Sequence, residues 1–157
     1  MKKIIIAGFI ILLAAALFLA NQLYLITAYN EGELVSLKPI LGENEELVYQ
    51  YTHSVEKGPV REYFKITSGS LIFYKTTFTS QGAGLPLDRG NFTKENGVFV
   101  RKGMEDEFAY INFRLSQVYE QQIIEIADTE IKMSDWGEPG QRIRLEVKSL
   151  PSILNIF

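Results

Sequence analysis

The only histidine of the chain, His53, lies in a segment whose side chains could bind a ligand or a partner. Residues 56–59 (Glu-Lys-Gly-Pro) separate two runs rich in aromatic and β-branched residues, which predicts a hairpin with a four-residue loop. This register pairs residue 53 with residue 62, so His53 and Glu62 would be neighbours on a largely apolar sheet face. A partly desolvated imidazole beside a carboxylate tends to stay protonated. The alternative is a polar pair that only holds the hairpin in register.

A second segment, Ser80 to Pro86, could line a cleft near the hairpin. Its glycines permit positive φ or close backbone approach, and its proline keeps the preceding residue extended. The alternative is a structural bend between two strands. The two segments together supply the candidate ligand- or partner-binding residues, which are His53, Glu62, Ser54, Glu56, Arg61, Gly82, Gly84 and Pro86.

Catalytic and metal chemistry are poorly supported by the residues present. Ser54 directly follows His53, so in a strand the two side chains would point to opposite faces. The chain has no cysteine and one histidine, which argues against a zinc site and excludes a cysteine nucleophile. No nucleophile-elbow or calcium-loop motif is present. We therefore expect no catalytic residue, no metal and no cofactor.

Charge argues against a nucleic-acid partner. The 157-residue chain carries 16 basic and 19 acidic side chains. Lys2 and Lys3 precede an apolar run, so removing them from the 16 basic residues leaves 14 against 19 acidic ones in the rest. Nucleic acids select basic surfaces, and anionic lipid headgroups do likewise.

The apolar run from Ile4 to Ala20 predicts a membrane anchor. As a helix it spans roughly 26 Å, slightly less than the hydrocarbon core of about 30 Å, and continuing to Ile26 would lengthen it. Tyr24 and Tyr29 would then supply interfacial contacts. The preceding lysines place the N-terminus in the cytoplasm and the rest outside. A cleaved signal peptide is the alternative. Residues 1–29 are thus expected to form the anchor, and residues 30–157 an extracytoplasmic domain.

The exported part predicts an all-β domain, an antiparallel sandwich or barrel preceded by one transmembrane helix. After a polar linker at residues 30–33, short runs rich in β-formers are bounded by turn residues. Residues 94–97 carry an Asn-Gly hairpin signal. Residues 116–127 suit a helix or a strand, and we favour the strand. The expected strands are Glu33 to Lys38, Glu46 to Val55, Val60 to Ile66, Leu71 to Thr79, Val98 to Arg101, Ala109 to Leu115, Gln122 to Ile126, Glu130 to Met133 and Ile143 to Val147.

Two blocks resemble the domain of unknown function 1850 family. They are residues 51–57 (Tyr-Thr-His-Ser-Val-Glu-Lys) with Pro59, Val60 and Glu62, and residues 82–86 (Gly-Ala-Gly-Leu-Pro). The likeness extends roughly from Glu33 to Val147. Members are small bacterial proteins with an N-terminal signal or anchor, often encoded beside tripartite ATP-independent periplasmic transporters of the TAXI type. The positions that match the family pattern are His53, Ser54, Glu56, Pro59, Glu62, Gly82, Gly84 and Pro86.

The resemblance implies an accessory role near a solute importer, without implying an activity. Possible partners are the transporter membrane subunit and an extracytoplasmic solute-binding protein. We therefore expect a single-pass membrane protein that acts by protein or small-ligand binding. An alternative is a stand-alone binding domain for an anionic small molecule, using protonated His53 with Arg61 or Arg89. An envelope hydrolase ranks last, since no nucleophile with its base is visible.

Overall fold

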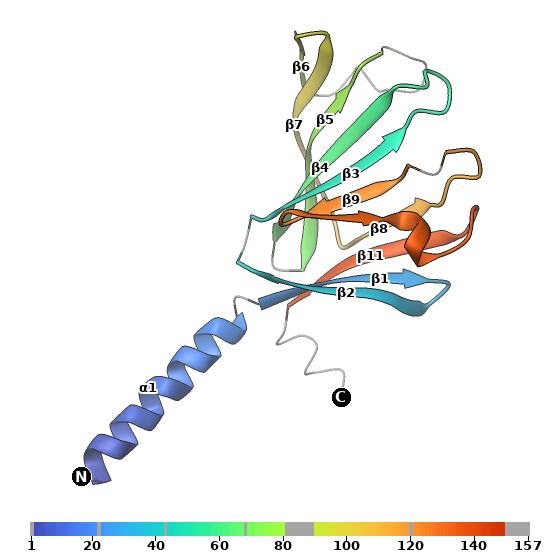
Figure 1. The fold of residues 1–157 in the computed structure, drawn as a ribbon. Coiled ribbons are helices and arrows are strands. Elements are labelled where there is room, and N and C mark those ends of the chain that lie inside the picture. Colours follow the sequence, from blue (N-terminus) through green and yellow to red (C-terminus); the bar gives the residue numbers. More distant parts are fainter. Residues whose placement is uncertain are drawn as a thin grey trace.

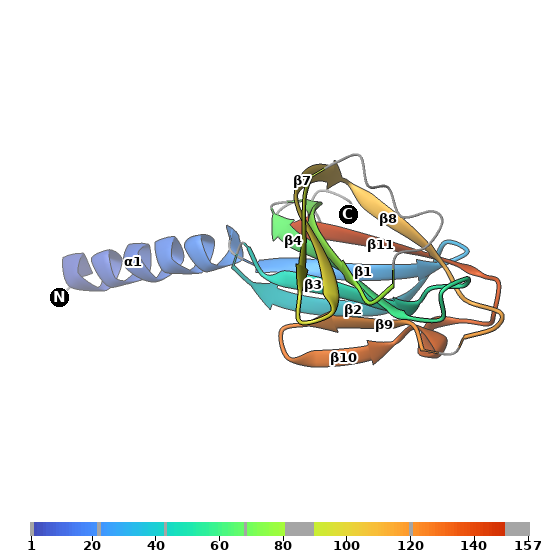
Figure 2. The ribbon, with the colours of Figure 1, turned by 90° about the horizontal axis from the view of Figure 1, so that it is seen from above.

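The fold consists of two antiparallel β-sheets preceded by one helix (Figures 1 and 2). The computed structural model describes residues 2–21, 23–42, 44–67, 69–80, 90–119 and 121–149. Helix α1 (Lys2–Asn21) projects away from the sheets. The predicted antiparallel β domain is thus confirmed, and its two sheets form a sandwich rather than one closed barrel.

The small sheet has four strands in the order β2 (Glu33–Leu41), β1 (Leu23–Asn30), β11 (Arg142–Ser149) and β8 (Tyr110–Arg114). The large sheet has seven strands in the order β10 (Thr129–Lys132), β9 (Ile123–Ile126), β3 (Glu46–Thr52), β4 (Pro59–Thr67), β5 (Ser70–Phe78), β7 (Val98–Phe108) and β6 (Asn91–Glu95). A short 3-10 helix, η1 (Met133–Trp136), follows β10.

The core lies between the sheets, and period-two alternation builds it. In β11, Ile143, Leu145 and Val147 are buried, while Arg142 and Arg144 are exposed on the opposite face. Buried residues of β1, β3, β4, β5, β8 and β9, together with Leu115, also belong to the core, and Met133 and Trp136 of η1 join it. The small sheet therefore presents one apolar face to the core and one polar face outward.

The predicted continuation of the helix to Ile26 is wrong, because residues 23–30 form strand β1. This strand pairs with β2 on one side and β11 on the other, in the middle of the small sheet. Tyr24 is 3% exposed and belongs to the core, so it makes no interfacial contact. The expected polar linker at residues 30–33 is a tight turn, with positive φ at Glu31 and Gly32.

Helix α1 packs against little else, and its side chains from residue 5 to residue 17 are exposed. Among the residues whose side chains are described, no helix is both long and apolar enough to cross a membrane.

Most expected strands are present, and two others were missed. Residues 116–127 contain strand β9 as favoured, and the Asn96-Gly97 hairpin joins β6 to β7. The missed strands are β1, which was assigned to the anchor, and β6. Strand β7 is also longer than expected, because it continues through an irregularity opposite β5 and reaches Phe108.

The predicted register of the β3–β4 hairpin is wrong. Tyr49, not His53, lies opposite Glu62, and β3 ends at Thr52. The loop has the predicted four residues but begins two residues earlier, at residue 54. His53 closes it, since its N–H donates to the Gly58 carbonyl at 2.9 Å and its carbonyl accepts from Lys57 N–H at 2.9 Å. The register differs by an even number of residues, so Glu62 keeps its predicted face.

Candidate functional site

His53 shapes the hairpin turn instead of pairing with Glu62. Its Nδ1 accepts hydrogen bonds from the backbone N–H groups of Val55 (3.3 Å) and Glu56 (3.2 Å). The predicted pair of His53 and Glu62 is not formed, because Tyr49 lies opposite Glu62.

Glu62 instead lies on the inner face of the large sheet, among tyrosines. Tyr51 donates a hydrogen bond to its Oε1 at 3.3 Å. Burial raises the pKa of Glu62, and the Tyr51 hydrogen bond and the Arg101 charge only partly oppose this effect. Burial also raises the pKa of Tyr49, which stacks on Tyr51, to about 12. Burial between the sheets therefore favours the neutral forms of Glu62 and Tyr49.

The other predicted site residues are dispersed. Ser54 is exposed in the loop. Glu56 accepts a hydrogen bond from Ser80 Oγ at 2.8 Å, which ties the hairpin to the residues that follow β5. Arg61 forms an ion pair with Glu125 on the outer face of the large sheet. The remaining predicted residues, Gly82, Gly84 and Pro86, lie outside the described residues, as does Arg89.

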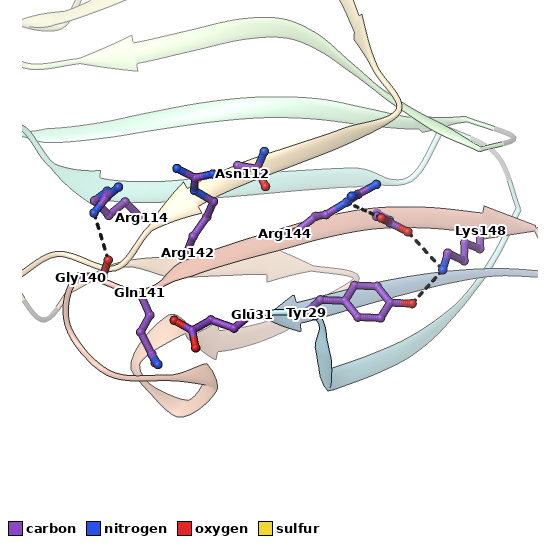
Figure 3. A pocket seen from close by; sticks show the side chains of 11 residues that line it. Tyr29, Glu31, Asn112, Arg114, Gly140, Gln141, Arg142, Arg144 and Lys148 are labelled. Atoms are coloured by element: carbon purple, nitrogen blue, oxygen red, sulfur yellow. Dashed lines mark hydrogen bonds and ion pairs between the residues drawn. The ribbon is translucent and has the colours of Figure 1, made fainter.

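A groove on the outer face of the small sheet, which sequence reasoning missed, is the better candidate site (Figure 3). Its volume is about 710 Å³, within the range of roughly 300–1,000 Å³ that small-molecule sites occupy. Four basic and two acidic side chains line it, although the whole chain carries a net charge of -3. The lining residues are Tyr29, Glu31, Gly32, Asn112, Arg114, Gly140, Gln141, Arg142, Arg144, Glu146 and Lys148.

Strand register places the groove residues. Arg114 of β8 lies directly opposite Arg142 of β11, and Asn112 lies opposite Arg144. Directly opposed residues on one face have Cβ atoms about 5 Å apart. The outward positions of β11 therefore form a polar row. At its first position, Arg142 lies beside Arg114 of the neighbouring strand β8.

The end of the groove near Arg114 is fixed by hydrogen bonds. Gln122 Nε2 donates to the Arg114 carbonyl at 3.0 Å and to the Tyr49 hydroxyl at 2.6 Å, so this amide links β8 to the large sheet. Arg114 Nη1 donates to the Gly140 carbonyl at 3.2 Å. Asn30 Nδ2 donates to Gln141 Oε1 at 2.9 Å, which holds the loop that follows η1.

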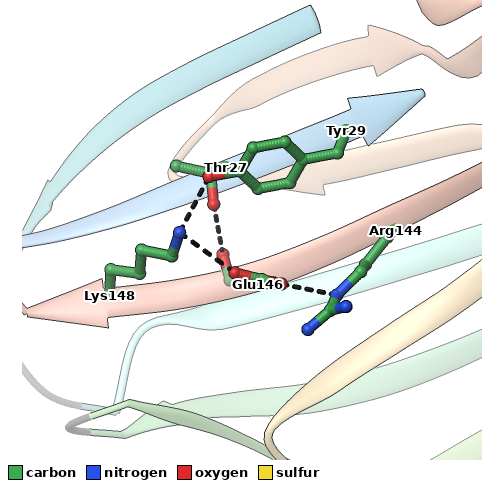
Figure 4. Close-up of polar contacts among 5 residues, drawn as sticks. All are labelled: Thr27, Tyr29, Arg144, Glu146 and Lys148. Atoms are coloured by element: carbon green, nitrogen blue, oxygen red, sulfur yellow. Dashed lines mark hydrogen bonds and ion pairs between the residues drawn. The ribbon is translucent and has the colours of Figure 1, made fainter. Parts of the chain in front are cut away.

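Opposite charges occupy the other end of the groove (Figure 4). Glu146 forms ion pairs with Arg144 Nε at 2.5 Å and with Lys148 Nζ at 3.2 Å. Lys148 also donates to the Tyr29 hydroxyl at 2.8 Å, and this hydrogen bond is the main cause of its raised pKa. The Arg144 guanidinium lies 3.9 Å from the centre of the Tyr110 ring. At this end of the groove, the Glu146 carboxylate therefore compensates the positive charges of Arg144 and Lys148.

The groove has the chemistry of a binding surface. It offers guanidinium and amide donors, which bind carboxylate and phosphate oxygens. Within the described parts of the chain, no three histidine, aspartate or glutamate side chains are grouped so as to hold a metal ion. The described residues that line the groove include no serine and no histidine, so they offer no hydroxyl nucleophile with a histidine base.

A family model described as Domain of unknown function (DUF1850) matches residues 47–133, more than half of the chain. The chain belongs to this family. The DUF1850 match covers β8 and all of the large sheet except Glu46, so it includes the hairpin, Asn112 and Arg114. Strands β1, β2 and β11 lie outside it, and with them most of the groove. No curated protein matches the chain, and no solved structure does.

One signal in the sequence pointed toward the groove. Residues 142–148 (Arg-Ile-Arg-Leu-Glu-Val-Lys) alternate charged and apolar side chains, which predicts a strand with one charged face. The partner residue Arg114 lies 28 positions earlier and faces Arg142 only through strand order. The two blocks that carry the DUF1850 resemblance, in the hairpin and at residues 82–86, include none of the groove residues.

Proposed function

We propose that this DUF1850 protein is a membrane-tethered, extracytoplasmic accessory protein that acts by binding. Helix α1 carries the proposal, since its large apolar side chains are exposed around the helix, including Ile5 (68%), Phe9 (67%) and Leu12 (72%). Exposed apolar area costs about 25 cal/mol per Å² in water, so such a helix is stable only when another apolar phase covers it. A lipid bilayer is the cover that the apolar run and the preceding lysines favour.

The tether holds the groove near the membrane. A single residue separates the end of α1 from the start of β1, and β1 lies beside β11 in the sheet that carries the groove. Strand β1 has eight residues and spans roughly 26 Å at about 3.3 Å per residue. The groove would thus remain within a few nanometres of the bilayer, where tethering raises its effective concentration near membrane partners.

The resemblance to transporter-associated members suggests the partner class. We propose a tripartite-type solute importer, through its membrane subunit or its extracytoplasmic solute-binding protein. The groove supports an accessory binding role, because it combines a ligand-sized volume with donors suited to anionic groups.

Extraction of native membranes with alkaline carbonate tests the tether. The full chain should remain in the membrane pellet, and Leu12→Ile should behave identically. Leu12→Lys should shift protein to the supernatant, since a lysine at a helix centre costs about 2.5–3.5 kcal/mol in insertion. Recovery of the unaltered chain in the supernatant would contradict the tether.

Crosslinking followed by affinity capture tests the accessory role separately. Membranes of the native host, treated with a short crosslinker, should yield an importer subunit or its solute-binding protein with the captured chain. Capture of neither, under conditions that preserve a known importer complex, would refute the proposed association.

A further inference from the structure

Two arginines of the groove lie opposite each other, and neither forms an ion pair with a carboxylate among the described residues. Arg114 and Arg142 are directly opposed across β8 and β11, and both are exposed. Like charges directly opposite each other destabilise a sheet. Arg144, by contrast, is paired with Glu146. Within the described residues, the Arg142 guanidinium has no ion-pair or hydrogen-bond partner, and Arg114 uses one nitrogen on a backbone carbonyl.

One member of this pair, Arg114, is held in place by hydrogen bonds before any ligand arrives. The Gln122 amide fixes the Arg114 carbonyl at 3.0 Å, and the Gly140 carbonyl fixes the Arg114 guanidinium at 3.2 Å. Gly140 itself is anchored, because its N–H donates to the Leu115 carbonyl at 2.8 Å. A preorganised guanidinium loses less freedom on binding, which increases affinity for a matching ligand.

We propose that Arg114 and Arg142 clamp a single oxyanion, a carboxylate or a phosphate group, in the groove. A guanidinium presents a planar fork of donors that matches either group. Asn112 and Gln141 line the same groove and offer further amide donors. The bridging anion would replace the repulsion between the arginines with two charge-assisted contacts.

The groove also restricts the ligand. Glu31 and Glu146 line it together with the arginines. An extended polyanion in the groove would therefore be repelled by these two carboxylates. A small molecule with one carboxylate or phosphate at the clamp avoids both. This inference concerns the groove of the β domain, and it does not depend on the proposed tether or importer.

The test uses the full chain in neutral detergent micelles, with inorganic phosphate and acetate as separate probes. Thermal unfolding is followed by fluorescence of Trp136, the only tryptophan, which is buried in the core. A ligand that binds the folded state raises Tm with concentration and saturates. Sodium chloride at matched ionic strength separates binding from screening.

At least one probe should raise Tm saturably, and its apparent Kd gives the affinity. Arg142→Gln should weaken that affinity by about tenfold or more, as expected for a lost charge-assisted hydrogen bond. The control Lys132→Gln, which removes an exposed positive charge of β10 outside the groove, should change it by less than about threefold. Without probe and at low salt, Arg142→Gln should also raise Tm, and added salt should remove this gain.

The outcomes are distinct. A response to phosphate alone identifies a phosphate clamp, and a response to acetate alone identifies a carboxylate clamp. No saturable response to either probe, or equal affinity of the Arg142→Gln variant and the unaltered chain, would overturn the proposal. Membrane extraction and importer capture are measured independently, so failure of the clamp leaves those results unaffected.

Discussion

Replacing Leu145 with alanine should destabilise the domain far more than replacing its neighbour Arg144. Leu145 is 0% exposed and lies between Ala28 of β1 and Ile111 of β8. Three carbon atoms are lost, worth about 2.4 kcal/mol at about 0.8 kcal/mol per buried methylene. Both flanking strands are fixed by hydrogen bonds, so the cavity cannot fully collapse. The expected total is about 3–4 kcal/mol.

Arg144→Ala is the matched control on the other face of β11. This side chain is 48% exposed and loses one ion pair and one contact with the Tyr110 ring. Half-exposed pairs of this kind contribute roughly 0–1 kcal/mol. The two substitutions thus test whether the inward and outward positions of β11 are assigned correctly, on which the groove depends.

Urea unfolding of the full chain in detergent, followed by Trp136 fluorescence, measures both effects. With a slope of about 2 kcal/mol per M, Leu145→Ala should lower the midpoint by roughly 1.5–2 M, and Arg144→Ala by less than about 0.5 M. An equal or reversed order would show that β11 faces the other way. The alternation that places Arg142 in the groove would then be refuted.

Three further predictions concern other parts of the fold. Glu62→Gln should be more stable than the unaltered chain at pH 7, because burial raises the pKa of this carboxyl and the folded state favours its neutral form. The difference in stability between Glu62→Gln and the unaltered chain should shrink as pH falls toward 4.5, the ordinary pKa of a glutamate. Urea midpoints at several pH values measure this difference, and a difference that does not change with pH would contradict the prediction. His53→Ala should cost about 1 kcal/mol by removing two turn hydrogen bonds, whereas His53→Asn, whose side chain can accept the same bonds, should cost less. Gly90→Ala should lower the thermal midpoint much more than Gly69→Ala; both glycines have positive φ, but only at Gly90 would a new Cβ meet a backbone carbonyl, that of Lys102, at 2.4 Å.

Strand content could be predicted from the sequence because it depends on local pattern. Alternating apolar residues and turn signals, such as Asn96-Gly97, act within a few positions and were sufficient for most strands. Strand β1 was missed because its largely apolar composition, Leu-Tyr-Leu-Ile-Thr-Ala-Tyr-Asn, follows the apolar run of α1 after only two polar residues, Asn21 and Gln22. Only pairing with β2 and β11 distinguishes it from helix.

The hairpin shows how a correct loop length can still give the wrong pair. Pro59 suggested a loop residue, yet it begins β4 opposite Thr52. The imidazole of His53 accepts hydrogen bonds from two backbone N–H groups inside the turn, which stabilises the loop at its observed position. Such side-chain capping competes with strand pairing, and strand propensities do not describe it.

The groove was beyond prediction for a different reason. Its residues come from β1, β8 and β11 and from two turns, and their proximity is set by strand order. Arg114 and Arg142 each look like ordinary solvated charges in sequence. Their pairing is a property of topology, which local patterns do not encode.

The order of strands in the small sheet has a consequence for how the molecule matures. Among the described strands, the first, β1, needs the last, β11, as its partner, since Thr27 and Glu146 face each other although they lie 119 positions apart. A chain synthesised from its N-terminus must therefore leave one edge of β1 unpaired until β11 has been made. Such edges recruit foreign strands, so a nascent or prematurely terminated chain would be a natural substrate for chaperones and proteases.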